Sequence, residues 1–364
     1  MLSTSDLFSS SLIWRFQSFF GVEKVQCLER GKQKKWKTIN IDEKPKNEDT
    51  PTEENIIYYR VRDCHYWSCL HLLPLQVNSW WYYFFLAGTH LGEEPFGAAF
   101  FSFWFWNLDS SIGRRLVLVW NLVMYLGQGL KDVIQLERPR MPEVVRLQTK
   151  WSEEFGLPST HAMMGLSVPW AAFYLTLEKY SFPPSLAVSV TCVWVLLVTG
   201  SRMYLGMHSL ADILAGLLLT TLLMPTLLHL VTISDIFLLS SPLAPFLSLS
   251  ASLLALLLFP RTPNHHWSPS ARTAVDVLAC YQGVQLGQWC LFRLGLVQII
   301  HHTSLTIPIT RPDLSSILLI ISRVLTGGAV AVAVQSIVKP ATRYLSRFAT
   351  ISRTRQNLII ASKV

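Results

Sequence analysis

The sequence has few charged residues for its length. Of its 364 residues only 15% are charged and 51% are hydrophobic, and the mean hydropathy is +0.34, whereas a soluble globular domain carries about 25% charged residues. This deficit excludes an ordinary soluble enzyme. We expect an all-α fold, a polytopic membrane bundle of about eight helical spans, because a bilayer is crossed by helices whose backbone groups are bonded internally.

Paired cysteines and internal repeats are also missing. The six cysteines are scattered and form no CxxC pair, so we expect neither a disulfide framework nor a zinc site, and we expect no metal or other cofactor. Transporters commonly contain internal repeats, and the lack of one argues against a transporter or channel. The N-terminus lacks the pattern of a cleavable signal peptide, which leaves targeting to the first span.

The net charge of +8 comes from basic residues in the tails and short loops. Such segments beside a membrane meet anionic lipid headgroups, so we expect a membrane as partner and no nucleic acid. The acidic run IDEKPKNEDTPTEE cannot bury enough apolar surface to become ordered. We therefore predict a disordered soluble tail (1–65), a membrane-embedded domain (66–338) and a basic C-terminal tail (339–364).

Apolar segments long enough to approach a membrane span recur along this domain. They are Leu116–Leu130, His161–Leu177, Pro184–Thr199, His208–Val231, Ile236–Phe259, Ala274–Ile300 and Leu314–Val338. Upstream, residues 80–106 are aromatic and apolar but are interrupted by His90, Glu93, Glu94 and Pro95. This pattern predicts a half-length or interfacial helix followed by a span.

Three short stretches place ionisable residues at the ends of these spans. They are KDVIQLERP with Lys131 and Arg138, GLPSTHAM with Ser159, Thr160 and His161, and GSRMYLGMHSLADILAG with Ser201, Arg202, His208 and Asp212. A charged group in hydrocarbon costs several kcal/mol, so such residues indicate function. The order of the spans brings all three stretches to the same side of the membrane.

Three of these residues are cations with little opposing charge. Lys131, Arg138 and Arg202 are balanced only by Asp212, and a phosphoryl group is the usual target of such a cluster, because arginine binds it bidentately. The helix predicted to start at Ser159 adds unpaired backbone N–H groups that favour an anion. The cluster therefore predicts a phosphate site.

Two histidines supply chemistry beside that phosphate. His208 and Asp212 are four residues apart and share a helix face, so the carboxylate can accept a hydrogen bond from one ring nitrogen and leave the other to attack phosphorus. His161 would protonate the departing alkoxide. The pattern predicts a metal-free phosphomonoesterase with a phosphohistidine intermediate. A structural His–Asp pair and interfacial cations remain the alternative interpretation.

The combined pattern K-x6-RP, PS-x-H and SR-x5-H-x3-D resembles the type-2 phosphatidic acid phosphatase superfamily, whose helical core is shared with vanadium haloperoxidases. The resemblance implies that His208 is the nucleophile, that Asp212 orients it and that His161 is the general acid. It also implies phosphate-binding residues, which are Lys131, Arg138, Ser159, Ser201 and Arg202. These roles agree with those derived from the residues themselves.

From about Leu91 to the last span the sequence is similar to one branch, the sphingosine-1-phosphate phosphatases of the endoplasmic reticulum. The branch implies hydrolysis of sphingosine 1-phosphate and related sphingoid phosphates to free base and phosphate, with the substrate entering from the bilayer and a luminal site. Glu137 departs from the branch, which commonly has proline there. An acid beside Arg138 would weaken phosphate binding if it pointed into the site.

Other functions stay open at this stage. The same chemistry would serve a phosphatase for phosphatidate or a polyprenyl diphosphate, and a non-catalytic relative would bind lipid phosphates without hydrolysing them. Orientation follows from Arg114, Arg115 and Lys179, which favour a cytosolic position for their loops and hence a luminal site. The basic C-terminal tail argues against that orientation. The oligomeric state is not determined.

Overall fold

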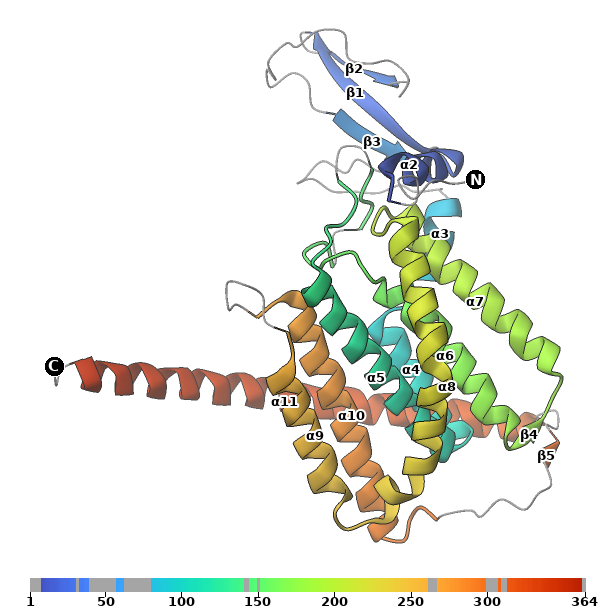
Figure 1. Ribbon diagram of the computed structural model, residues 1–364, viewed down its shortest axis with the longest axis vertical. Coiled ribbons are helices and arrows are strands. Elements are labelled where there is room, and N and C mark those ends of the chain that lie inside the picture. The colour runs from blue at the N-terminus through green and yellow to red at the C-terminus, as the bar shows by residue number, and fades with distance from the viewer. Residues whose placement is uncertain are drawn as a thin grey trace. The chain divides into compact units, whose positions relative to one another are not determined.

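Helices form nearly all of the membrane domain in the computed structural model, which describes residues 8–30, 33–38, 57–61, 80–140, 144–148, 151–260, 267–298, 307–308 and 313–361. The helices (Figure 1) are α2 (Ser10–Phe19), α3 (Trp80–His90), α4 (Glu94–Asn107), α5 (Ser110–Ile134), α6 (Thr160–Leu177), α7 (Pro184–Tyr204), α8 (Leu210–Ser240), α9 (Ala244–Leu258), α10 (Pro269–Arg293) and α11 (Leu314–Ala361). The helical fold class predicted for this domain is confirmed.

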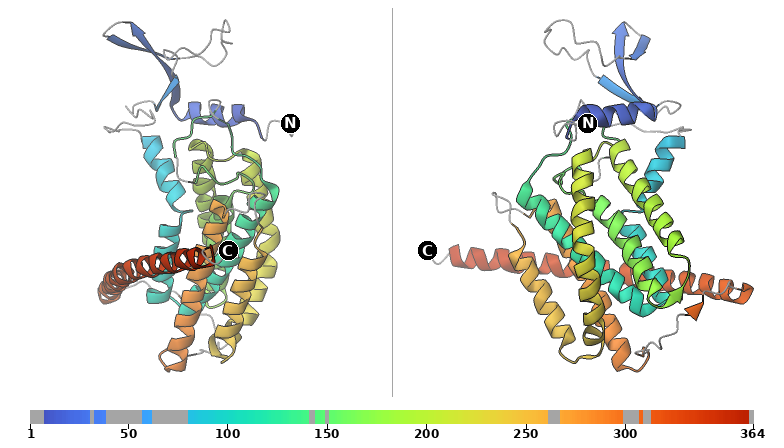
Figure 2. Two further views of the ribbon diagram at one scale, coloured as in Figure 1. Left: turned by 90° about the vertical axis from the view of Figure 1, so that its left-hand side faces the viewer. Right: turned by 45° about the vertical axis from the view of Figure 1, so that its right-hand side comes forward.

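The chain divides into two compact units. The first contains residues 1–101 and 111–309, and the second contains residues 102–110 and 310–364. In the first unit, α6 contacts α7 and α8, and α10 contacts α8 and α9, as the views in Figure 2 illustrate. In the second, Arg323 Nη1 of α11 donates to the carbonyl oxygen of Trp106 at 3.2 Å.

Three helical segments in the described part of the chain are long and apolar enough to cross a membrane. They are Pro184–Tyr204, Leu210–Ser240 and Leu314–Tyr344. Many large apolar side chains of α7, α8 and α9 are exposed, among them Leu196, Leu222 and Leu257, which suits contact with lipid. The total of about eight spans stays a prediction. Helix α8 runs on to Ser240, beyond the span end predicted at Val231.

The segment 1–65 contains order that its composition did not predict. Strand β1 (Val22–Arg30) pairs antiparallel with β2 (Gln33–Thr38) and with β3 (Ile57–Val61). The prediction of a disordered tail rested on its small apolar surface alone, whereas strands are also held by backbone hydrogen bonds to neighbouring strands. A second, two-residue pairing joins β4 (Tyr180–Ser181) to β5 (Ile307–Pro308) in parallel.

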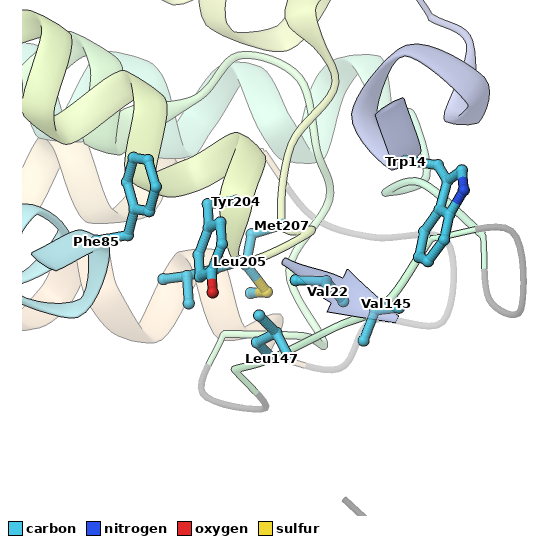
Figure 3. Close-up of a cluster of buried hydrophobic side chains, with 8 residues drawn as sticks. All are labelled: Trp14, Val22, Phe85, Val145, Leu147, Tyr204, Leu205 and Met207. Atoms are coloured by element: carbon cyan, nitrogen blue, oxygen red, sulfur yellow. The ribbon is translucent and has the colours of Figure 1, made fainter. Parts of the chain in front are cut away.

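Helix α2 also lies within the segment that was predicted to be a disordered tail. Its Trp14 belongs to a buried cluster with Val22, Phe85, Val145, Leu147, Tyr204, Leu205 and Met207 (Figure 3). Gln17 of α2 is fully buried and donates through Nε2 to the carbonyl oxygens of Val145, at 2.6 Å, and Tyr204, at 2.8 Å. The N-terminal segment therefore supports the loop and helix end that carry the site residues described below.

The predicted boundary at residue 339 is not a break in secondary structure. Helix α11 continues from Leu314 to Ala361 and contains Pro340 in its interior. The basic residues assigned to a tail thus follow the last predicted span without an intervening loop. Hydropathy falls after Val338, but a fall in hydropathy does not by itself end a helix, which needs a cap or a breaker such as an αL glycine.

Candidate active site

The three motifs predicted to converge do so at one end of helices α5 to α8. Lys131, near the C-terminal end of α5, donates from Nζ to Thr160 Oγ1 at the start of α6, at 3.0 Å. The backbone N–H of Ser159 donates to the carbonyl oxygen of Asp212 in α8 at 3.0 Å. The predicted arrangement of span ends is therefore present in the fold.

Local sequence explains why these ends lie so close. Ser159 is the N-cap of α6, and its side chain accepts from the N–H of Ala162 at 3.4 Å. A Cβ added at Gly216 would lie 2.7 Å from the carbonyl oxygen of Ser159. Glycine thus lets α8 approach the start of α6. Gly206, at φ +68, ends α7 and would place a Cβ 2.1 Å from the Val145 carbonyl oxygen, so only glycine fits there.

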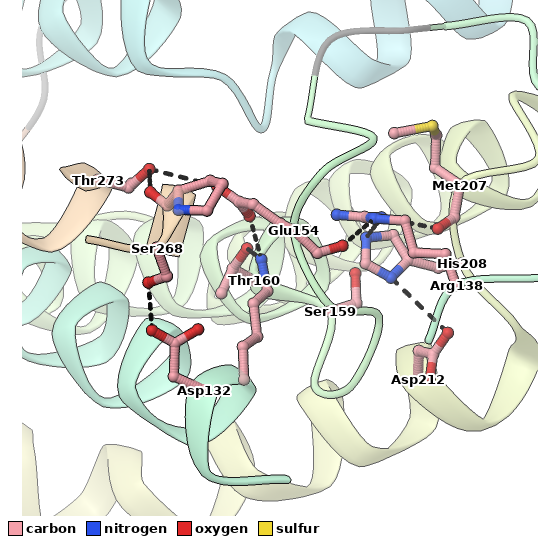
Figure 4. Close-up of polar contacts among 12 residues, drawn as sticks. Asp132, Arg138, Glu154, Ser159, Thr160, Met207, His208, Asp212, Ser268 and Thr273 are labelled. Carbon is pink, nitrogen blue, oxygen red and sulfur yellow. Dashed lines mark hydrogen bonds and ion pairs between the residues drawn. The ribbon is translucent and has the colours of Figure 1, made fainter. Parts of the chain in front are cut away.

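His208 has a defined tautomer in this arrangement. Its Nε2 lies 3.0 Å from Arg138 Nη1, and the residue is fully buried (Figure 4). A guanidinium only donates hydrogen bonds, so Nε2 is the acceptor and carries no proton. The ring proton then resides on Nδ1, which faces Asp212 Oδ2 at 3.8 Å. Nε2 is thereby the nitrogen with a lone pair directed toward the cations.

The electrostatic surroundings keep His208 neutral. It lies in the loop between α7 and α8, outside the apolar spans. Burial, followed by the charges of Arg138, Arg202 and Lys131, lowers the pKa of His208 well below its ordinary value. A neutral imidazole at physiological pH has the free lone pair that a nucleophile requires. All three predicted cations therefore act electrostatically on this ring, and Arg138 contacts it directly.

Asp212 differs in detail from its predicted role. Its Oδ2 accepts the backbone N–H of Ser209 at 2.7 Å, and Ser209 Oγ accepts the N–H of Asp212 at 3.1 Å, which forms a capping box at the start of α8. At 3.8 Å, the distance to His208 Nδ1 is too long for a hydrogen bond. The carboxylate fixes the helix start and faces the Nδ1 of the neutral His208 without a hydrogen bond.

Glu154 is the main residue that the sequence analysis missed. Its Oε2 lies 2.6 Å from Lys131 Nζ, and its Oε1 accepts from Thr273 Oγ1 at 3.3 Å. Burial alone would raise the pKa of Glu154, but the charge and hydrogen bond of Lys131 outweigh it and hold the pKa below its ordinary value. The prediction that only Asp212 balances the cations was wrong. The sequence signal that could have identified Glu154 is its position shortly before the PSTH stretch.

Arg138 is held by the backbone of the same loops. Its Nε donates to the carbonyl oxygen of Glu154 and its Nη1 to that of Met207, both at 2.7 Å. Burial, offset in part by the carboxylates of Glu154 and Asp212, lowers the pKa of Arg138 to about 10. The group remains a cation at neutral pH, so it is fixed beside His208 with its charge intact.

Arg202 keeps unused donors. Its Nη1 donates to Thr89 Oγ1 at 2.7 Å and to Gln148 Oε1 at 3.0 Å. Within the described part of the chain, its Nε and Nη2 have no hydrogen-bond partner, although the side chain is fully buried. Because a buried unpaired donor costs free energy, two such donors on one guanidinium fit an anion that binds there.

The remaining predicted residues are placed less uniformly. Ser201 is fully buried, but its Oγ donates to the carbonyl oxygen of Val198 at 2.6 Å, so its hydroxyl hydrogen does not face a ligand. His161 lies in the first turn of α6 and lines a pocket with Glu154 and Thr160. Ser159 occupies the N-cap, as predicted. The structure brings all of these positions to one region but directs the Ser201 hydroxyl elsewhere.

Glu137 does not enter the site. Its side chain is 70% exposed and pairs with Arg140, itself 80% exposed, at 3.2 Å. An exposed pair of this kind contributes little free energy. The departure from the branch pattern at this position therefore leaves Arg138 unaffected, and the concern raised by the sequence does not apply.

The family model of the PAP2 superfamily matches residues 95–234, the range that contains every predicted site residue. Residues 95–234 are a PAP2 superfamily domain. This match agrees with the helical bundle. The matched residues include the ends of α5 to α8, where the three motifs meet.

Two similar proteins with this domain come from one branch. The chain is 40% identical over 229 residues to sphingosine-1-phosphate phosphatase 1 of Mus musculus, and the aligned region covers 62% of this chain and 53% of the mouse protein. It is 32% identical over 271 residues to sphingosine-1-phosphate phosphatase 2 of Homo sapiens, with 74% and 66% covered. The chain thus spans between about half and two thirds of these relatives' lengths.

Proposed function

We propose that this protein is a membrane phosphatase that hydrolyses sphingosine 1-phosphate and related phosphorylated sphingoid bases. The observation that carries the proposal is a fully buried, neutral His208 whose unprotonated Nε2 faces Arg138, with Arg202 and Lys131 nearby. A nucleophile close to fixed cations suits attack on a dianionic phosphate, and similarity to sphingosine-1-phosphate phosphatases supports the sphingoid substrate.

The proposed reaction has two steps. In the first, His208 Nε2 forms a bond to phosphorus while the bond to the alkoxide oxygen breaks, and His161 gives a proton to that oxygen. In the second, the oxygen of a water molecule bonds to phosphorus while the bond from phosphorus to His208 Nε2 breaks, and the water gives a proton to His161, so that inorganic phosphate leaves and His208 is regenerated. Lys131, Arg138 and Arg202 would stabilise charge on the equatorial oxygens in both transition states. No step requires a metal ion.

Phosphate contacts follow from the donors still available. The ammonium of Lys131 has three donors, two of which are bonded to Glu154 and Thr160. Arg202 has Nε and Nη2 unpaired in the described residues. Ser159, at the N-cap of α6, is proposed to contribute through the helix start. The Ser201 hydroxyl would need to leave Val198 before it donated to phosphate.

The substrate proposal is tested by phosphate release in membranes that express the chain and are treated with a chelator. Sphingosine 1-phosphate is expected to be hydrolysed with a kcat/KM at least about 10-fold above that for phosphatidate, since binding contacts distinguish polar headgroups by this order or more. A faster reaction with phosphatidate or a polyprenyl diphosphate would assign another lipid substrate. No hydrolysis of any of them by well-expressed protein would favour a non-catalytic lipid-phosphate binder.

We further propose that the protein lies in the endoplasmic reticulum membrane and that its active centre faces the lumen. Arg114 and Arg115 lie at the N-terminal end of α5, opposite Lys131, and pair with Asp235 and Glu178. Basic residues at that end support a cytosolic position for it. The lipid substrate would then reach the luminal end from the bilayer.

Orientation is checked by protease protection in sealed microsomes with an epitope tag inserted after Met141. The tag is expected to be protected until detergent opens the vesicles, because it lies in the loop between Arg138 and Glu154. A tag placed in the loop after Lys179 is the matched control and is expected to be cut in intact vesicles. Cleavage of the first tag from outside would assign the active centre to the cytosol.

A further inference from the structure

A pocket beside His161 differs in charge from the cation cluster that it adjoins. Its lining includes Glu93, Glu94, Gln128 and Glu154. The described lining thus contains three carboxylates and no lysine or arginine. Glu154 also pairs with Lys131, so the pocket begins where the proposed phosphate site ends. A ligand that bridges the two would carry an anion at one end and hydrogen-bond donors next to it.

Glu93 is fixed within this pocket and connected to the phosphate site. It is buried, and its Oε1 accepts from Gln148 Nε2 at 3.1 Å while its Oε2 lies 3.2 Å from His90 Nδ1. The other end of the Gln148 amide, Oε1, accepts from Arg202 Nη1 at 3.0 Å. One side chain therefore joins the carboxylate of Glu93 to the guanidinium proposed to bind phosphate.

Glu93 also lines the same pocket as the proposed proton donor, His161. It follows Gly92, and a Cβ added at Gly92 would be 3.2 Å from His161 Cδ2. The chain between α3 and α4 thus packs on the imidazole. In a sphingoid phosphate the oxygen that His161 would protonate is bonded to carbon 1, and the amino group is on carbon 2. That amino group would therefore lie beside this chain segment.

A second, independent group in the pocket points to a donor ligand. Gln128 is 2% exposed, and its Oε1 has no hydrogen-bond partner among the described residues. Because a buried unpaired carbonyl oxygen is unfavourable, this atom suits a ligand N–H or O–H. A sphingoid base offers both, an ammonium on carbon 2 and a hydroxyl on carbon 3.

We infer that Glu93, assisted by Gln128, recognises the amino group of the substrate and selects amino-alcohol phosphates over glycerolipid phosphates. The inference rests on the proposed function. Next to its phosphate, phosphatidate presents ester oxygens, which only accept hydrogen bonds. Those oxygens would bring no donor to Glu93 and would leave the buried Oε1 of Gln128 unpaired among the described residues, and a site that leaves a buried polar group unpaired rejects the ligand strongly.

The test compares two substrates that share a chain length, sphingosine 1-phosphate and octadecyl phosphate, which lacks the amino group on carbon 2 and the hydroxyl on carbon 3. The readout is the ratio of their kcat/KM values for the full chain in detergent micelles. Glu93→Gln is expected to lower this ratio by about 10- to 100-fold, the discrimination typical of one charge-assisted hydrogen bond. Glu93→Asp keeps the charge and should restore part of the ratio. Glu137→Gln, an exposed carboxylate outside the pocket, should leave it within about twofold.

Each outcome decides the inference. An equal loss on both substrates would assign Glu93 to positioning Arg202 through Gln148, and an unchanged ratio would remove any recognition role; either result overturns the inference while the proposed function stands. Failure of the wild type to hydrolyse sphingosine 1-phosphate would overturn the proposed function itself. If Glu93→Gln does not fold, Gln128→Leu tests the same pocket, and a ratio that it leaves unchanged counts against amine recognition.

Discussion

Replacement of His208 by alanine is expected to lower kcat/KM for the lipid phosphate by about 10⁴-fold or more, because it removes the nucleophile of the proposed reaction. Nε2 of His208 is the only protein atom that bonds to phosphorus in the proposed reaction, and the tautomer of the ring is set by Arg138. No neighbouring group replaces a lost covalent step. The loss should appear in kcat, since Lys131, Arg138 and Arg202 remain to bind phosphate.

Two measurements check this result. Phosphate release is measured under single-turnover conditions, and covalent labelling is measured by rapid quench with a substrate that carries ³²P, where wild type is expected to show alkali-stable, acid-labile label and the variant none. His229→Ala is the matched control because His229 is exposed on α8. Label that persists in the His208 variant would contradict the assignment and direct attention to another nucleophile.

Replacement of Arg202 by lysine is expected to lower kcat/KM by about 10²- to 10³-fold, the usual effect of losing a preorganised donor to transition-state charge. Arg202 Nη1 is occupied by Thr89 and Gln148, which leaves Nε and Nη2 for phosphate. An ammonium is a single point charge and does not hold two protein partners and bind a phosphate bidentately at once. Because lysine keeps the positive charge, the loss in kcat/KM measures the contribution of the guanidinium geometry of Arg202.

The comparison requires a control for folding, because Arg202 is fully buried. The melting temperature in detergent is recorded for the variant and for Arg140→Lys, which changes an arginine that is 80% exposed and should leave activity within about twofold. Wild-type activity in a stable Arg202→Lys protein would show that its guanidinium serves packing alone. A fall in activity that tracks the melting temperature would also remove it from the phosphate contacts.

The helices and the site region were both largely predictable, for the same physical reason. Apolar runs interrupted at intervals by turns reveal helices in a membrane protein, and ionisable residues are so costly there that the few present mark the functional end of the bundle. Lys131, Arg138, His161, Arg202 and His208 could thus be selected from the sequence. Their approach to one another followed from the alternation of spans, and the fold contains it.

Errors arose where neighbours distant in sequence decide the role of a residue. Glu154 looks like a loop acid, yet it pairs with Lys131 across 23 positions. Gln17 belongs to a segment whose later composition suggests disorder, yet it bonds to Val145 and Tyr204. Asp212 is four residues from His208, but the capping box competes for its carboxylate. The partners of Glu154 and Gln17 cannot be seen in a local pattern, whereas the S-x-x-D capping box of Asp212 is local and was overlooked in the sequence.

The sequence by itself determined the class of protein, the helical order and the residues able to carry phosphate chemistry, because burial cost and motif spacing are properties of the chain. Only the tertiary structure decided which donors remain unpaired, which nitrogen of His208 carries the proton, and that Glu93 and His161 line one pocket. Those facts depend on distances between segments, and hydrogen bonds act over about 3 Å, far below what a sequence pattern specifies.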